Sequence, residues 1–410
     1  MKLPDAYDLL DPETIDDPYP WYAWLREHAP VHRIPGTQVF TVSTRELILE
    51  ALDRQSDFSA NLTGVLITGP SGEPTLFDLA DFGTPIDALA TADEPAHAAH
   101  RRLILPHVTP GRIAEFEPLL RDWSAERIDP LVAEGGGEFM ARVADPIPTR
   151  ASARLVGLPI EDADRLLAWS VSGAEILAGP TTRERLLEVN AETSEMGVYL
   201  AEHLARAVVD GRDAPALDVL HEVAAAVRSG ALELADGVAN LVILVSAAGE
   251  STSSLTGNAA RLIAEDPVLQ TELRARPERI PALVEETLRL ESSFRFHYRV
   301  VKRATRLGNA RLQPGDRLML LWGAANRDPA LFPDPDRVDL DRANLHDHLA
   351  FGRGIHFCVG ARLARLEARV ILEELLARTR TISLDGSRAP RFARTIQVRR
   401  HTTLPIVTEA

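Results

Sequence analysis

The stretch that decides the fold is Phe351-Gly-Arg-Gly-Ile-His-Phe-Cys-Val-Gly-Ala-Arg-Leu-Ala-Arg365, which surrounds the only cysteine of the chain, Cys358. Gly352 precedes the sulfur and permits a tight turn, while Gly360 follows it and permits the close approach of a flat, bulky group. An amphipathic helix is expected directly afterwards. Its amide dipoles would point at the sulfur and favour the thiolate. The pattern therefore predicts that Cys358 is a cofactor ligand.

Two other roles for Cys358 fit the surrounding residues less well. Free cysteines most often pack in the core, but Arg353 and His356 stand in the same glycine-rich loop, which is poor core material. A cysteine hydrolase would need a histidine base, and His356 is only two residues away along the chain, which gives poor geometry. One cysteine also excludes an intramolecular disulfide, a four-thiolate zinc site and a four-thiolate iron-sulfur cluster.

Composition and charge describe an ordinary globular protein. The 410 residues are 45% hydrophobic and 26% charged, and 45 Lys and Arg against 60 Asp and Glu give a net charge of −15. This balance argues against nucleic acid or an anionic membrane as a partner. Residues Met1–Leu10 contain no signal sequence, and the longest apolar run, Leu241–Gly249, is shorter than the ~20 residues that span a bilayer. We expect a soluble, cytoplasmic protein.

Helical periodicity dominates the chain. Apolar residues recur at three- and four-residue spacing in Thr149–Val156, Arg185–Val209 and Pro281–Leu290. β-branched residues punctuated by turn residues predict hairpins in Val31–Val42 and Arg299–Leu320. The expected fold is mainly α, of the α+β class.

Turn-rich stretches separate these elements without forming a linker. They are Thr63–Pro85, Gly135–Gly137, Asp210–Asp213 and Arg327–Asp339. The chain is therefore expected to be a single domain, residues 1–410. Because Thr63–Pro85 is long for a connection inside a compact domain, it is predicted to be a lid or binding loop.

The glycine-rich segment resembles the haem-binding loop of the cytochrome P450 superfamily, whose pattern is Phe-Gly-x-Gly-x-His-x-Cys-x-Gly. Further motifs occur in the expected order, so the resemblance covers essentially the whole chain. It implies the cytochrome P450 fold, with small sheets in the N-terminal third and near the C-terminus, and a haem b whose iron is ligated by Cys358. Gly249–Thr252, Phe294–Arg299 and Gly323–Asp328 suggest the mycobacterial 144 family.

The resemblance extends to a structural triad. Glu286 and Arg289 lie three residues apart on a periodic helix, which places them on one face where they can pair. They match the Glu-x-x-Arg motif of the superfamily. Arg342, in the segment before the cysteine loop, matches its third member. The three are expected to support the cysteine loop.

Haem carries two propionates, which need cationic or hydrogen-bonding partners when buried. The resemblance assigns this role to His97, Arg101, Arg299 and His356, beside the loop residues Phe351, Gly352 and Gly360. Ordinary surface or core positions are expected for His100, Arg102 and His297.

The oxygen-activating helix departs from the family pattern Ala-Gly-x-acid-Thr. One alignment places the acid at Glu250 and puts Ser251 where threonine is usual. The other makes Thr252 the alcohol and leaves Ser251 at the acid position. We prefer the first, in which Glu250 and Ser251 relay protons. Serine lacks the methyl group that restricts χ1, so proton delivery would be looser than usual.

The resemblance implies a monooxygenase that uses O₂ and electrons from ferredoxin and ferredoxin reductase to hydroxylate a small, largely apolar substrate. Radical coupling without oxygen insertion and a haem sensor or carrier are the alternatives; Glu250 beside two hydroxyls weighs against a sensor. A monomer is expected. Candidate pocket residues are Val65, Leu66, Leu244, Ala248, Phe294, Phe296 and Ile396. The segment around the ligand carries Arg353, Arg362, Arg365 and Arg369 against a single acid, Glu367. Arg362 and Arg365 are predicted to help form a basic patch for an acidic ferredoxin, while Arg369 fits a solvated helix face equally well.

Overall fold

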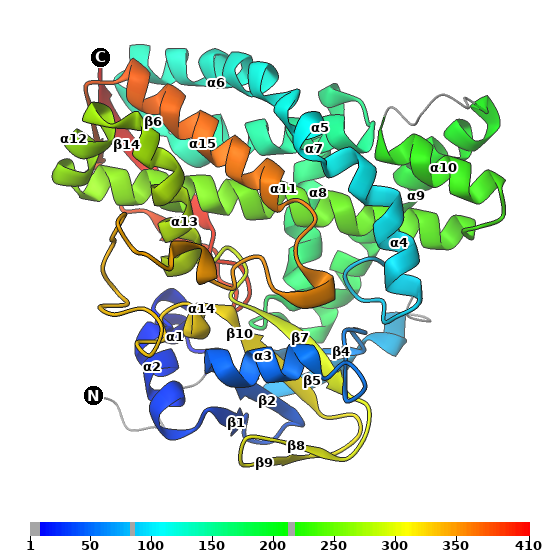
Figure 1. Ribbon diagram of the computed structural model, residues 1–410. Helices are drawn as coiled ribbons and strands as arrows, with labels where there is room; N and C mark the ends of the chain where they lie inside the picture. The colour runs from blue at the N-terminus through cyan, green and yellow to red at the C-terminus, as the bar shows by residue number, and fades with distance from the viewer. Residues whose placement is uncertain (1–8, 83–86, 212–217) are drawn as a thin grey trace.

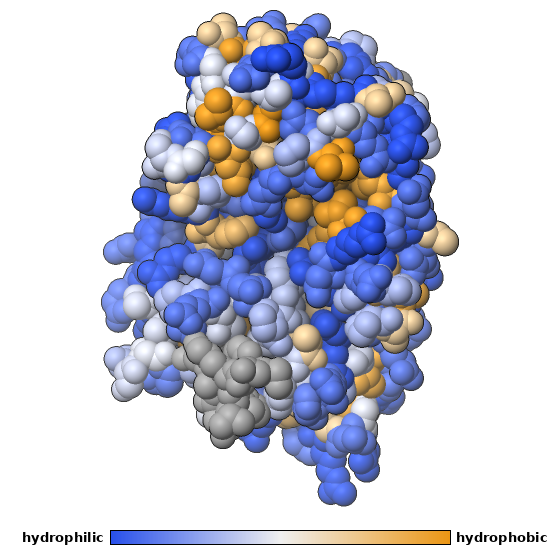
Figure 2. Space-filling view, turned by 90° about the vertical axis from the view of Figure 1, so that its left-hand side faces the viewer, coloured by the Kyte–Doolittle hydropathy of each residue, from blue (hydrophilic) through white to orange (hydrophobic). Residues whose placement is uncertain are grey.

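The computed structural model describes residues 9–82, 87–211 and 218–410. Figure 1 shows helices gathered in the upper part of the molecule and a mixed sheet with three N-terminal helices in the lower part. The face shown in Figure 2 is mostly hydrophilic, with separate hydrophobic patches. The shorter helices are α1 (Pro12–Asp16), α2 (Tyr19–His28), α3 (Arg45–Asp53), α4 (Ala96–Ile104), α5 (Pro110–Ala114), α10 (Val219–Arg228), α12 (Pro267–Ala275) and α14 (Trp322–Ala325).

The helical part is built around α11 (Leu234–Glu265). This helix packs against α7 (Pro146–Val156), α8 (Ala163–Ala174), α9 (Arg183–Asp210) and α15 (Ala361–Arg378), and α15 packs in turn on α6 (Phe116–Ala133). By length and composition alone, α11 could cross a membrane. Its helical neighbours and its buried Asn240 and Asn258 instead make it a core helix.

The predicted helices are confirmed. Thr149–Val156 lies in α7, Arg185–Val209 in α9, and Pro281–Leu290 in α13 (Ile280–Leu290). Each begins within a few residues of the expected start, because apolar spacing marks where a helix can bury one face.

The main sheet joins both halves of the sequence. Its strand order is β1 (Val31–Arg33), β2 (Val39–Val42), β10 (Arg317–Leu321), β7 (Phe296–Val301) and β3 (Phe58–Ser59), with β2 and β10 parallel. A second sheet has the order β11 (Thr381–Leu384), β14 (Pro405–Glu409) and β6 (Gly136–Glu138). Both predicted hairpin regions form strands; the shorter pairs are β8 (Thr305–Leu307) with β9 (Ala310–Leu312) and β12 (Arg391–Phe392) with β13 (His401–Thr403).

Two predictions of irregular structure are wrong. Most of Thr63–Pro85 is an antiparallel hairpin, β4 (Gly64–Thr68) and β5 (Pro74–Asp78), followed by a 3₁₀ turn at Leu79–Phe82; residues 83–85 lie outside the described residues. The apolar run at Val65 forms a buried strand that the nearby turn residues obscured.

The glycines at residues 135–137 belong partly to a strand. Gly136 and Gly137 lie in β6 with φ of +123° and +153°, and a Cβ at Gly136 would collide with the Ile406 carbonyl. Glycine is required here because β14 approaches closely. The turn at Arg327–Asp339 is found, whereas residues 212 and 213 of another predicted turn lie outside the described residues.

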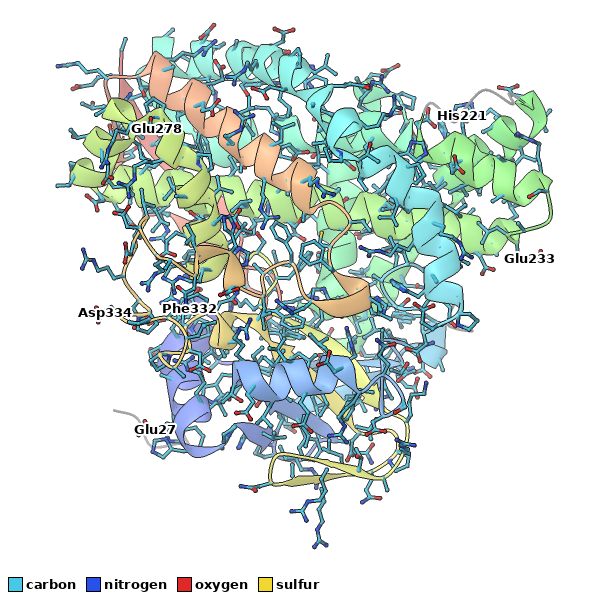
Figure 3. The ribbon with its side chains drawn as sticks, in the orientation of Figure 1. Glu27, His221, Glu233, Glu278, Phe332 and Asp334 are labelled. Carbon is cyan, nitrogen blue, oxygen red and sulfur yellow. The ribbon has the colours of Figure 1, made fainter. Side chains whose placement is uncertain are left out.

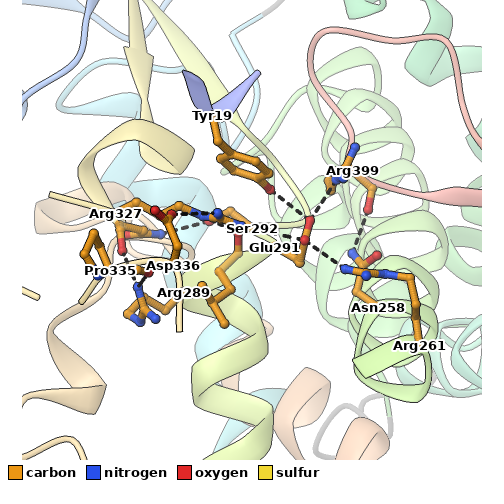
Figure 4. Close-up of polar contacts among 12 residues, drawn as sticks. Tyr19, Asn258, Arg261, Arg289, Glu291, Ser292, Arg327, Pro335, Asp336 and Arg399 are labelled. Carbon is orange, nitrogen blue, oxygen red and sulfur yellow. Dashed lines mark hydrogen bonds and ion pairs between the residues drawn. The ribbon is translucent and has the colours of Figure 1, made fainter. Parts of the chain in front are cut away.

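A buried carboxylate ties four distant segments together (Figure 4). Glu291, just after α13, accepts from the Tyr19 hydroxyl at 2.8 Å, Arg399 Nε at 2.7 Å and Arg261 Nη2 at 2.9 Å. Burial opposes the charge, but Arg399, Arg261 and Arg327 lower the pKa of Glu291 to about 2. Helix α2, helix α11, the end of α13 and the C-terminal segment are thus joined by the Glu291 carboxylate.

Glu291→Gln should destabilise the protein by about 3–5 kcal/mol at neutral pH, because it leaves buried guanidinium groups uncompensated. The folded pKa is depressed, so the charge stabilises the protein above the ordinary carboxyl pKa of 4.5, and that contribution is lost as pH falls towards about 2. The difference from wild type, measured by denaturant unfolding across pH, should therefore shrink in acid. The exposed Glu278→Gln is the matched control; equal effects of both variants would contradict the prediction.

Candidate active site

The cysteine loop is a tight turn stabilised by its own backbone. The Cys358 amide donates to the Phe351 carbonyl at 2.9 Å, and the Phe357 amide donates to the Gly354 carbonyl at 3.1 Å. Gly352 and Gly354 have φ of +67° and +76°, a region that favours glycine. Gly360 has an ordinary φ of −82°, and a Cβ there would lie 3.9 Å from the Cys358 sulfur. The loop therefore presents the sulfur on a rigid turn.

The electrostatic surroundings of Cys358 differ from those predicted, because the groups that favour the thiolate are opposed by a larger effect of burial. Backbone amides of Gly360 and Ala361 do hydrogen-bond the sulfur, and Arg101 and Arg365 also favour the thiolate. Burial outweighs them, so the pKa of Cys358 is raised rather than lowered. Dipoles at the start of α15 are insufficient by themselves, and the thiolate needs a further positive charge. A ligated metal ion supplies such a charge, because a coordinating thiol is deprotonated.

The triad of Glu286, Arg289 and Arg342 is assembled beneath this loop. Arg289 donates to Glu286 through Nη2 at 2.7 Å and Nε at 2.8 Å, and Arg342 Nε donates to Glu286 Oε1 at 2.9 Å. The Glu286 and Arg289 side chains have no exposed surface. Arg289 lies over the Phe332 ring, and Arg342 donates to the Asp334 carbonyl at 2.8 Å; Figure 3 labels both of these loop residues. The guanidinium groups thus fix the turn-rich segment before the cysteine loop.

The neighbouring Glu285 forms a second anchor that the sequence did not reveal. Its buried carboxylate accepts from Arg365 Nε at 2.5 Å and contacts the ring nitrogen of His348 at 3.0 Å. Burial opposes this charge, but Arg365 and His348 lower the pKa of Glu285 to about 2. Arg365 also lies 4.5 Å over the Phe351 ring. It couples the start of α15 to the cysteine loop and to α13.

This contact corrects the predicted basic patch. Arg365 is bound to Glu285, and Arg369 is bound to Glu373 and Glu117. In the described part of the chain, Arg353 and Arg362 are exposed and form no ion pair. The fixed spacing of arginines along a helix does not show which of them meet a carboxylate from another element.

Four predicted partners of the propionates are brought together beside the cysteine loop. The His97 and His356 rings lie 4.1 Å apart, and Arg101 Nη1 donates to the Phe357 carbonyl at 2.8 Å. Arg299 is buried and donates to the Tyr298 carbonyl at 2.7 Å. Burial lowers the pKa of Arg299 to about 10 and that of His356 to about 3.

These groups fit a ligand that carries carboxylates. Among the described residues, Arg299 has no carboxylate within ion-pair distance, and His97 Nε2 and His356 Nδ1 are buried without a hydrogen-bond partner. A cavity of about 170 Å³ adjoins them and is lined by Arg299, His356, Arg353, Lys302, Asp93 and Glu94. Orphaned donors and an uncompensated guanidinium are costly unless an anion binds there. The residues therefore fit the propionates of haem.

The consecutive residues Glu250, Ser251 and Thr252 face three different surroundings on α11, as expected at 100° per residue. Ser251 Oγ donates to the Ala247 carbonyl at 2.7 Å, and both residues keep exposed surface although α11 is a core helix. Glu250 is buried, and burial raises its pKa to about 7. Thr252 is buried on another side of the helix. Which of the two alcohols relays protons stays a prediction.

Thr252 contacts the single acid that stands among the arginines around Cys358. Its hydroxyl hydrogen-bonds the carboxyl of Glu367, which lies on α15, is only 3% exposed, and has a pKa raised well above the usual value by burial. Glu367 was expected to be one charge among arginines. The apolar residues Leu363, Val370 and Ile371, which share its helix face at i−4, i+3 and i+4, were the available signal that this position faces the core.

His297, expected to be ordinary, lies two residues before Arg299 on β7. Its Nδ1 accepts from the Trp322 indole at 2.8 Å, which fixes the neutral tautomer with a proton on Nε2. The protein groups around the ring desolvate it and lower the pKa of His297 to about 4, although part of the side chain is exposed. The ring therefore offers one neutral donor near the Arg299 guanidinium.

The candidate pocket residues divide into two groups. Val65, Leu66, Phe296 and Ile396 are buried together in one hydrophobic core, and Leu244 belongs to the larger core around α11. Ala248 and Phe294 are partly exposed. Contact of any of them with a substrate stays a prediction. No group of three or more metal-ligating side chains occurs among the described residues.

Comparison with known proteins identifies the family. Residues 253–404 match the family described as Cytochrome P450. Cytochrome P450 144 of Mycobacterium tuberculosis is 40% identical over 382 residues, which cover 92% of this chain and 86% of that protein. The chain belongs to the cytochrome P450 family.

Other relatives of this cytochrome P450 agree. Cyclomarin C epoxidase CymV of Salinispora arenicola is 32% identical over 89% of this chain and 90% of its own length. The solved structure of cytochrome P450 CREJ in complex with (4-ethylphenyl) dihydrogen phosphate superposes with a TM-score of 0.89 at 27% identity, covering 99% of this chain and all of that one. The predicted fold and the resemblance to the 144 family are confirmed.

Membership makes the protein a bacterial haem-thiolate monooxygenase with haem b as its cofactor. When bound, the haem supplies the activation of O₂. The chain must supply the thiolate, hold the propionates, deliver protons and shape the pocket. Redox partners such as ferredoxin and an organic substrate belong to the same chemistry.

Proposed function

We propose that this cytochrome P450 inserts one oxygen atom of O₂ into a small, largely apolar substrate, with the iron ligated by Cys358. The cysteine loop carries the proposal. It combines a tight turn, amides directed at the sulfur, and neighbouring imidazoles with unpaired nitrogens beside Arg299, which has no carboxylate within ion-pair distance among the described residues. His97, Arg101, Arg299 and His356 would hold the propionates.

Glu250 and Ser251 are the proposed proton relay. Oxygen insertion consumes two electrons and two protons and releases the second oxygen atom as water. A carboxyl whose pKa is about 7 can both hold and release a proton near neutral pH. The Ser251 hydroxyl, one residue along the helix and partly exposed, is placed to pass that proton on. The name of the relative CymV, an epoxidase, favours oxygen insertion over radical coupling.

Apolar residues favour an apolar substrate. Leu244 and Ala248 lie on the same helix as Ser251, and the Phe294 ring lies 5.4 Å from that of His297. Pockets of this kind combine apolar walls with a few polar groups that set orientation. We propose a cytoplasmic monomer of one domain.

Cys358→Ser should abolish the red-shifted Soret band of the reduced carbon monoxide complex, because serine cannot provide a thiolate. The measurement is the difference spectrum of the reconstituted variant. Ser383→Ala, at an exposed serine on β11, is the control and should keep the band. A normal band in Cys358→Ser would refute ligation by this residue.

Ser251→Ala should uncouple electron consumption from product and release peroxide, whereas Thr252→Ala should do so much less. The Thr252 hydroxyl is already engaged by Glu367, while that of Ser251 lies on the open side of α11. Peroxide formed per electron pair, measured with an active substrate, separates the two alignments. The reverse order of effects would assign the relay to Thr252, and unchanged coupling in both would favour radical coupling.

Electrons are proposed to come from a separate acidic ferredoxin. Arg353 lies in the cysteine loop and Arg362 at the start of α15, so both exposed cations are close to Cys358 along the chain. Donor docking near the ligand shortens the electron path. Arg365 is excluded from this surface patch, because its replacement would break the contact with Glu285 and disturb the loop itself.

An Arg353→Glu, Arg362→Glu double variant should reduce the rate of ferredoxin-driven reduction several-fold at low salt. The difference should fade above roughly 0.1 M salt, where the Debye length falls below ~10 Å. Stopped-flow reduction across ionic strength is the measurement. Arg311→Glu, an exposed arginine on β9, is the control. Equal rates and salt dependence in the double variant and wild type would place docking elsewhere.

A further inference from the structure

A buried ion pair lies beside the proposed proton donor. Arg400, just before β13, places Nη2 2.8 Å from both carboxylate oxygens of Asp145, which immediately precedes α7. Both side chains are 9% exposed. Arg400 Nε is buried and has no hydrogen-bond partner in the described part of the chain. Nη2 of Arg400 is thus hydrogen-bonded to Asp145, whereas its Nε has no partner among the described residues.

The C-terminal segment that carries Arg400 runs along one face of α11. Ser254 Oγ and Asn258 Nδ2 donate to the Arg399 carbonyl at 2.5 and 2.8 Å, and Ser253 hydrogen-bonds the Asp145 carboxylate. Ser254 and Asn258 are four and eight residues after Glu250, so all three share this face. Glu250 therefore lies on the face of α11 along which the Arg400 segment runs. The same two groups are the charged neighbours that act on its pKa, after burial.

Charge balance then requires one proton. Two carboxyl groups face a single guanidinium in a buried environment, and ionisation of both would leave an uncompensated negative charge. Burial raises the pKa of Asp145 as well, and Glu138 of β6 adds to that effect. His401, next to Arg400, is kept neutral by burial, with a pKa of about 3, and Arg399 is occupied by Glu291. No second cation among the described residues is directed at Glu250.

We propose that Asp145 and Arg400 are positioning residues that determine whether Glu250 holds a proton. While Arg400 is bound to Asp145, Glu250 stays protonated and can donate towards Ser251. Once the Glu250 proton has passed to Ser251, Arg400 rotates so that its free Nε edge meets the Glu250 carboxylate, and Asp145, which has lost its cation, takes up one proton from solvent. That proton moves to Glu250 when Arg400 goes back to Asp145, so only O–H bonds break and form and the two carboxyl groups together keep one proton. This inference rests on the proposed relay and adds to it the device that sets its protonation.

The test is an infrared titration of the ferric holoprotein from about pH 5 to about pH 9, a range that brackets the Glu250 transition. The carbonyl band of protonated Glu250 is identified as the signal that Glu250→Gln removes. Asp145→Asn deletes the competing carboxylate and frees Arg400 for Glu250. Its expected effect is to lower the Glu250 midpoint by about one pH unit or more, because a like charge is lost and an opposite charge approaches.

An Asp145→Asn, Arg400→Gln double variant guards against misfolding, since it removes both charges together. Its Glu250 midpoint should lie above that of Asp145→Asn, because no cation remains to stabilise the carboxylate. Equal midpoints in wild type and both variants would overturn the proposal, as would a protein in which Glu250 is ionised over the whole range. The titration needs neither electrons nor substrate, so its outcome is independent of whether Ser251→Ala uncouples turnover.

Discussion

The fully buried contact between Glu286 and Arg289 is the interaction on which the cysteine side of the molecule depends. Neither side chain has exposed surface, so each charge is tolerable only because the other is present. Arg289 then uses its remaining donors on the carbonyls of Asn326, Pro335 and Arg337, and Arg342 joins from beyond them. Residues 326–342, which form neither helix nor strand, are thereby fixed by side-chain hydrogen bonds. The loop that carries Cys358 starts from this fixed base.

Burial of charge recurs throughout the functional part of the molecule, with a different outcome in each place. Glu285 and Glu291 meet enough guanidinium groups to remain ionised, and their pKa values are lowered to about 2. Glu250 and Glu367 face too few guanidinium groups, so burial raises their pKa values. The first two fix elements in place, whereas the raised pKa of Glu250 suits the proton relay proposed for it. Residues of one chemical type are thus divided between support and chemistry by the number of cations that face them.

The parts of this molecule that follow from local pattern could be predicted from the sequence. The helix over Ile280–Leu290, the strands near Val31–Val42 and the glycine turn before Cys358 each depend on spacing within one segment. Motif resemblance added the Glu286, Arg289 and Arg342 contacts, which join distant segments. The hairpin at Gly64–Asp78 was missed because turn residues between two short apolar runs look the same whether or not the runs pair.

The remaining site residues depend on contacts that no single segment encodes. Glu285 with Arg365 joins residues 80 positions apart, and Asp145 with Arg400 joins residues 255 positions apart. The Cys358 thiol could not be judged from its neighbours in sequence, because the helix start favours the thiolate while burial by the rest of the fold opposes it. Which effect is larger is a property of the packed molecule.

The parallel pairing of β2 with β10 also sets the order in which the chain can reach its final shape. Residues 39–42 must wait for residues 317–320 before the central strands can meet, and β6 must wait for β14 at residues 405–407. Closing loops of this size costs chain entropy before any contact repays it. When about the first two-thirds of the polypeptide has been synthesised, helices can form, but neither sheet can be complete. The main sheet can close once β10 has been made, whereas the second sheet waits for β14, which follows the cysteine turn in the chain.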